Sequence, residues 1–133
     1  VKISEIQKGL LILVGVETQD TQQDLDWLVA RVAKLRIFED LDGAMNVSLH
    51  DIGADVIVVS QFTLHASTKK GNRPSFIKAA KPEVAIPLYQ GFVDSLEKVL
   101  DKKIQTGKFG AMMDVALIND GPVTITIDSK NKE

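Results

Sequence analysis

Two apolar segments with the features of buried β-strands constrain the fold of this chain most strongly. GLLILVGVE at 9–17 is a continuous apolar run bounded by glycine, and ADVIVVSQFTL at 54–64 is a second strong strand signal. Short length and β-branched side chains favour strands over helices here. Neither run reaches the roughly 20 apolar residues that span a bilayer. A sheet built on these strands needs helices to cover it.

Two segments have the apolar periodicity of such helices. Residues 20–36 place apolar side chains on one stripe, and Asp20 or Thr21 can cap the start. Residues 81–100 carry a second stripe. Pro87 lies inside that stripe and predicts that the helix either begins near this residue or kinks there, because proline removes a hydrogen bond.

The rest of the chain divides into short strands and one basic loop. Asp42-Gly43 is a hairpin signal, and the loop covers residues 65–76. The predicted strands are 36–38, 44–49, 103–109, 112–118 and 123–128. The order β-α-β-β-β-α-β-β-β predicts one α/β domain over residues 1–133, with a mixed or antiparallel sheet and two main helices packed on one side.

The residue types present exclude several kinds of site. There is no cysteine, and the two histidines, His50 and His65, stand in different segments without metal-ligand spacing. We therefore expect no metal and, without a glycine-rich phosphate loop, no cofactor. A net charge of −2 gives no overall attraction to nucleic acid, so any RNA contact must be local. The first residues lack the apolar core of a signal peptide, which favours a cytoplasmic protein.

Two polar clusters, each attached to a predicted strand, are the candidate sites. Ser60-Gln61-Phe62-Thr63 follows the second strand, and Asn119-Asp120-Gly121-Pro122-Val123-Thr124 lies between two others. Taken alone, the first can be a strand end whose ring faces the core, and the second a hairpin turn. On a strand, Thr63 and His65 would point to the same face. The loop cations, including Lys69, Lys70 and Arg73, suit either a solvated surface or phosphate contacts.

Read together, these segments resemble the D-aminoacyl-tRNA deacylase family. SQFTL at 60–64 and NDGPVT at 119–124 look like its two signature motifs. The resemblance covers nearly all 133 residues in the family's order and includes six further segments: GLLILVGVE, LRIFED, MNVSL, KKGNRPSF, TGKFGA and VTITID. The resemblance implies a deacylase-like fold whose sheet curls toward a barrel. Family members usually have a further N-terminal strand segment, an Asp where Met112 precedes Met113, and an acidic residue at the position of Ser67.

The resemblance implies hydrolysis of the ester between a D-amino acid and the terminal adenosine of tRNA, together with removal of glycine mischarged onto alanine tRNA. It also implies a homodimer, with no DNA or membrane partner, whose site lies at the subunit interface. A cis Gly121-Pro122 bond is expected to reach into the pocket of the second subunit. A non-catalytic tRNA-binding module and a dimeric scaffold without an RNA partner are the alternatives.

The roles expected of the residues follow from this resemblance and from ester chemistry. Backbone N–H groups around Gln61 and Phe62 would stabilise the oxyanion, and Thr63 would act as nucleophile or, preferably, orient water. The substrate-binding residues would be Ser60, Met113, Asn119, Gly121 and Pro122, and the tRNA contacts Lys69, Lys70 and Arg73. Phe62 could stack on the terminal adenine. Main-chain carbonyls of Gly121 and Pro122 would hold the α-amino group of the substrate, so that the side chain of an L-amino acid would clash with the wall of the pocket.

Overall fold

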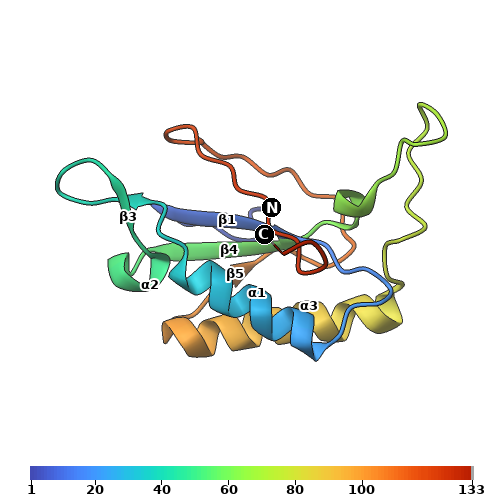
Figure 1. The fold of residues 1–133 in the computed structure, drawn as a ribbon, viewed down its shortest axis with the longest axis horizontal. Helices are drawn as coiled ribbons and strands as arrows, with labels where there is room; N and C mark the ends of the chain where they lie inside the picture. The colour runs from blue at the N-terminus through green and yellow to red at the C-terminus, as the bar shows by residue number, and fades with distance from the viewer. Residues whose placement is uncertain (133) are drawn as a thin grey trace.

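The computed structural model describes residues 1–132, and its centre is a three-stranded parallel sheet (Figure 1). The strands β1 (Gly9–Val14), β4 (Asp55–Ser60) and β5 (Gln105–Thr106) lie in the order β1-β4-β5. β1 and β4 pair in register from Gly9 with Asp55 to Val14 with Ser60. Both apolar segments that were predicted as strands therefore become neighbours in the sheet.

Two helices cover one face of this sheet (Figure 1). They are α1 (Gln22–Lys34) and α3 (Pro82–Leu100). Alternate residues of β4 face them, because side chains on a strand alternate between its two faces. The buried core contains, among others, Val56, Val58, Leu25, Val29, Phe92 and Leu96. Within residues 1–132, no helix is both long and apolar enough to cross a membrane.

The predicted hairpin and both predicted helices are present, with small differences at their ends. β2 (Phe38–Glu39) and β3 (Met45–Val47) pair antiparallel around the Asp42-Gly43 turn. A short helix that was not predicted, α2 (Leu49–Ile52), follows β3, and the Ser48 hydroxyl caps it by accepting the N–H of Asp51. α3 begins at Pro82 and continues through Pro87, so the alternative of a start near Pro87 is wrong.

The predicted strands 112–118 and 123–128 are wrong as regular strands. Residues 111–127, called the arm below, run as an extended excursion on the side of the sheet away from the helices (Figure 1). In the described part of the chain, the hydrogen bonds of residues 114–127 join them only to one another. Because no strand of the sheet pairs with the arm, the sheet is not closed into a barrel. It is also parallel, where a mixed or antiparallel sheet was predicted.

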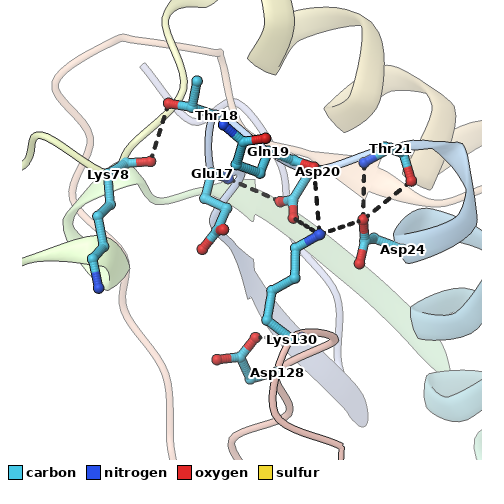
Figure 2. Close-up of polar contacts among 9 residues, drawn as sticks. All are labelled: Glu17, Thr18, Gln19, Asp20, Thr21, Asp24, Lys78, Asp128 and Lys130. Atoms are coloured by element: carbon cyan, nitrogen blue, oxygen red, sulfur yellow. Dashed lines mark hydrogen bonds and ion pairs between the residues drawn. The ribbon is translucent and has the colours of Figure 1, made fainter.

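The tail after the arm returns to the start of α1 (Figure 2). The Lys130 ammonium lies 2.9 Å from Asp24 Oδ2 and 3.7 Å from Asp20 Oδ1. Lys132 and Arg31 both approach the ring of Trp27, at 5.1 and 4.9 Å from its centroid. The tail therefore packs along the first half of α1.

Candidate functional site

The first candidate cluster forms where β4 ends and the chain turns. The Gln61 N–H still donates to the Val14 carbonyl at 2.8 Å, which continues the pairing with β1. Residues Phe62–His65 then form a single 3-10 turn, η1, and the Leu64 N–H donates to the Gln61 carbonyl at 3.2 Å. The prediction that the strand continues to residue 64 is wrong, since β1 offers no further partner beyond Val14.

This turn changes the expected directions of two side chains. On a strand Thr63 and His65 would share a face, but in a 3-10 turn residues two apart do not. The Gln61 side-chain amide donates to the Thr63 hydroxyl. His65 instead lies over the backbone of Gly15, where an added Cβ would be 3.0 Å from its ring. Its Nε2 is buried without a hydrogen-bond partner among the described residues.

A pocket lies beside the turn, between the sheet and α3. Ser60, Gln61 and Phe62 line one side, and Tyr89 and Phe109 line another. The buried Tyr89 hydroxyl donates to the Val58 carbonyl at 3.0 Å, and burial raises the pKa of this phenol. The structure therefore brings three of the predicted site residues to one concave surface. Tyr89 and Phe109 were not predicted as part of it, although TGKFGA was part of the family resemblance.

Two aromatic rings stand at the surface beside this pocket. Phe62 is 58% exposed, so the alternative in which its ring faces the core is wrong. Its ring meets Phe76 edge to face, with centroids 5.1 Å apart. Phe76 is 37% exposed and was not singled out from the sequence. An aromatic residue at the end of a polar, basic loop is the signal that could have identified it.

The basic loop is closed at its base and projects from the body (Figure 1). Ser67 and Ser75 exchange two backbone hydrogen bonds, each of 2.8 Å. Lys69, Lys70 and Arg73 lie between them and are all exposed. The three cations are thus gathered on one short excursion that starts directly after η1.

The second candidate cluster is the turn of the arm. The Asn119 side chain holds it, because its Oδ1 accepts the Val123 N–H at 2.8 Å and its Nδ2 donates to the Thr124 hydroxyl at 3.0 Å. The Gly121-Pro122 peptide bond is cis, as the resemblance implied. Gly121 and Pro122 are exposed, and their turn lies at the far end of the arm from η1 (Figure 1). One chain therefore does not bring its two clusters together.

Met113 lies at the base of the arm. Its sulfur accepts the Lys108 N–H at 3.3 Å, and an added Cβ on Gly107 would be 2.8 Å from it. It packs beside β5 and does not border the pocket lined by Phe62. Residues 1–132 contain no group of three or more His, Asp or Glu side chains placed to hold a metal ion.

Comparison with known proteins identifies the family of this chain. Residues 1–128 match the model of the D-Tyr-tRNA(Tyr) deacylase family. The chain belongs to this family. Relatives in the deacylase family include proteins named D-aminoacyl-tRNA deacylase from Flavobacterium johnsoniae, 66% identical over 99% of this chain and 88% of theirs, and from Parabacteroides distasonis, 58% identical over 98% and 87%.

Solved structures support the same fold. A structure titled c-Myc DNA Unwinding Element Binding Protein superposes with a TM-score of 0.86 at 41% identity, covering 92% of this chain and 83% of that one. A probable eukaryotic D-amino acid tRNA deacylase gives a TM-score of 0.71 at 16% identity, covering 80% and 77%, and shows the fold alone. Both candidate clusters lie inside the part of this chain that matches the deacylase family, whereas Lys130 and Lys132 lie just after it.

Proposed function

We propose that the 60–63 turn and the Gly121-Pro122 turn of a second copy together form the site at which this deacylase cleaves its substrate. As a member of its family, the chain is an enzyme that hydrolyses D-aminoacyl-tRNA to free D-amino acid and tRNA. The observation that carries the site is the pocket beside Ser60, Gln61 and Phe62, directly behind an exposed turn.

Hydrolysis of the ester needs hydrogen-bond donors that stabilise the oxyanion and a fixed position for the attacking water. The first N–H groups of a helical turn have no partner within it, and in residues 1–132 no hydrogen bond engages those of Phe62 and Thr63. These two N–H groups are our oxyanion donors, because the N–H of Gln61, an expected donor, is already bonded to Val14. An aminoacyl ester is activated, so such donors and a positioned water suffice.

Thr63 acts as the group that orients water. The Thr63 hydroxyl accepts a hydrogen bond from the Gln61 amide, so the proton of this hydroxyl points away from Gln61. A nucleophilic hydroxyl needs a base that takes its proton. Among the described residues, no side chain accepts a hydrogen bond from Thr63. Because the part of the chain that the structure describes offers no base here, the 2′-hydroxyl of the terminal adenosine takes part in moving the proton of the attacking water.

The exposed surface beside the pocket binds the 3′ end of the tRNA. Base–aromatic stacking contributes about 1–3 kcal/mol, and the exposed ring of Phe62 offers a face to the terminal adenine. Lys69, Lys70 and Arg73 lie on the loop that begins beside this ring, so they meet the phosphates that precede the terminal nucleotide.

The enzyme distinguishes D- from L-amino acids by steric exclusion of the L side chain. Main-chain carbonyls of Gly121 and Pro122 accept the hydrogen bonds of the α-amino group, and the side chain of an L-amino acid then points into the pocket wall. A clash rejects a wrong substrate more strongly than a missing contact does. Glycine has no side chain, so glycine mischarged onto alanine tRNA is also cleared.

A second copy of the chain completes the site. The two clusters lie far apart within one chain (Figure 1), and the arm exposes apolar side chains that a partner would cover. Ile118 and Leu117 of the arm are 93% and 59% exposed, and Leu13 on β1 is 43% exposed. Exposed apolar surface of this kind marks protein interfaces. The dimer acts in the cytoplasm, where charged tRNA is used.

The test is deacylation of matched substrates. Purified protein is incubated with D-tyrosyl-tRNA and L-tyrosyl-tRNA, and with a second pair that carries a small side chain, D- and L-alanyl-tRNA. We expect both D substrates to be cleaved at similar rates and both L substrates to survive. Cleavage of L and D substrates at equal rates would overturn the exclusion mechanism. Binding without cleavage of any of the four would favour the tRNA-binding module.

A further inference from the structure

The C-terminal tail places a lysine between two carboxylates at the start of α1 (Figure 2). Lys130 Nζ lies 2.9 Å from Asp24 Oδ2 and 3.7 Å from Asp20 Oδ1, and it donates to the Gln19 carbonyl at 3.4 Å. The side chains of Asp20 and Asp24 are only 15% and 14% exposed. Lys130 itself is 37% exposed, so the carboxylates are the sheltered side of this ion pair.

Both carboxylates are held in place by the backbone of the β1–α1 connection. Asp24 Oδ2 accepts the Thr21 N–H at 2.9 Å, and Asp20 Oδ2 accepts the Glu17 N–H at 2.8 Å. The hydrogen bond from Lys130, with that of Thr21, lowers the pKa of Asp24. Lys130 therefore meets a preformed site on the rigid body of the protein.

Hydrogen bonds in the described part of the chain join the segment to that body near both ends of the arm. At its start, Met113 packs against Gly107 and accepts the Lys108 N–H. Between residues 114 and 127, hydrogen bonds in the described part of the chain stay within the arm. After the arm, Lys130 bonds to the body at Asp24, and a turn closed by the Asp128 carboxylate presents it there.

We propose that Lys130 is a positioning residue for this deacylase, whose ion pair with Asp24 and Asp20 fixes the C-terminal end of the arm that carries Gly121-Pro122. Lys130 touches no substrate; it acts through the arm. An arm held at both ends samples fewer positions than one held at its start alone. Since a misplacement of about 1 Å can cost a hundredfold in rate, a loosened arm impairs the reading of handedness first. The inference rests on the proposed role of the Gly121-Pro122 turn.

The experiment compares Lys130→Met with two matched variants. Lys132→Met removes the same charge from the same tail, but its ammonium lies over Trp27 and not between carboxylates. Lys130→Arg keeps a cation within reach of Asp24. Each protein is assayed for kcat and KM on D-tyrosyl-tRNA and for cleavage of L-tyrosyl-tRNA. The mobility of the arm is measured with a nitroxide spin label on Thr126→Cys, which is added to each protein because the chain has no cysteine of its own.

We expect Lys130→Met to lower the ratio of D to L cleavage by roughly tenfold or more, mainly through kcat, and to increase the mobility of the spin label on the arm. Lys132→Met and Lys130→Arg should stay close to the wild type. Equal losses in Lys130→Met and Lys132→Met would overturn the proposal, because a general attraction of tRNA to the tail would explain them.

Unchanged mobility of the spin label in Lys130→Met would also overturn the proposal, whatever the activity. If the wild type fails to cleave D-tyrosyl-tRNA, the proposed function fails, yet the spin-label measurement still decides whether Lys130 holds the arm. Circular dichroism and the thermal midpoint show whether Lys130→Met is folded. If it is not, Asp24→Asn, which keeps an oxygen for the Thr21 N–H, takes its place in the spin-label experiment.

Discussion

The rings of Phe62 and Phe76 meet edge to face, with centroids 5.1 Å and planes 75° apart. Phe62 stands on the turn that follows β4, whereas Phe76 lies just past the closed base of the basic loop. The contact therefore links the proposed adenine-binding ring to the loop that carries Lys69, Lys70 and Arg73. Such a pair fixes a ring that would otherwise move freely in solvent.

Removing the supporting ring should weaken binding of tRNA more than it slows chemistry. Phe76→Leu loses an aromatic pair worth about 0.5–1.5 kcal/mol, so KM for D-tyrosyl-tRNA should rise by roughly two- to tenfold with a smaller change in kcat. Steady-state deacylation measures both constants. Phe76→Tyr keeps the ring and serves as the control; a KM for Phe76→Leu equal to that of Phe76→Tyr would show that the contact has no such role.

Gly121→Ala should reduce activity without unfolding the protein. Gly121 has a φ of +141°, and an added Cβ would be 2.8 Å from Val123 Cγ2. A backbone conformation of this kind costs a non-glycine residue about 1–3 kcal/mol, which the exposed turn can escape by moving. We expect kcat/KM on D-tyrosyl-tRNA to fall at least roughly tenfold, while Thr126→Ala, an exposed change on the same arm, has little effect. An unchanged rate for Gly121→Ala would contradict the role of the turn.

The parts of the fold that could be predicted are those where local pattern and packing agree. β1, α1, β4 and α3 each carry an apolar pattern that matches the surface they bury, and all four are present. The parallel sheet was not foreseen, because strand order depends on contacts between distant segments.

The arm shows why pattern alone fails. Residues 123–128 alternate as a half-buried strand does, but alternation describes side chains and does not supply a neighbouring strand for the backbone. The surroundings of the candidate site could be predicted only in part, because they also depend on distant segments. SQFTL marks the turn beside the pocket, whereas the places of Phe76, Tyr89 and Lys130 depend on contacts across long stretches of sequence, such as that of Tyr89 with Val58.

Thr63→Val should separate the two roles considered for this hydroxyl. If Thr63 orients water, Thr63→Val loses roughly a hundredfold in kcat, Thr63→Ser stays within a few-fold of the wild type, and no covalent intermediate forms. Rapid quenching of a single turnover, followed by denaturing electrophoresis of labelled substrate, detects an acyl-enzyme. Capture of labelled amino acid on the wild type but not on Thr63→Val would instead identify Thr63 as the nucleophile.

Tyr89→Phe should destabilise the protein slightly. The buried phenol donates to the Val58 carbonyl at 3.0 Å, and that carbonyl also accepts the Gly107 N–H at 3.1 Å. One partner remains after the substitution, so the cost should be near the usual value for a hydrogen bond, about 1 kcal/mol. Urea unfolding followed by the fluorescence of Trp27 gives the difference in free energy. A loss above about 3 kcal/mol would show that the hydroxyl also supports the packing of the pocket.

The ion pair of Lys130 should make stability depend on pH at the acidic end. The hydrogen bond from Lys130 lowers the pKa of Asp24 below its ordinary value in the folded chain. The unfolded chain therefore binds this proton first, so the stabilisation is complete above the ordinary carboxyl pKa of about 4 and is lost as pH falls through the folded value. Asp24 also raises the pKa of Lys130, which keeps the stabilisation constant up to the ordinary lysine pKa of about 10.

We expect the free energy of unfolding of the wild type to exceed that of Lys130→Met by a constant amount between about pH 5 and pH 9, and by less at pH 3. Urea unfolding of both proteins at pH 3, 5, 7 and 9 measures this difference, and Lys132→Met should show no such convergence with the wild type. A difference that persists undiminished at pH 3 would mean that Lys130 stabilises the tail by packing rather than by its charge.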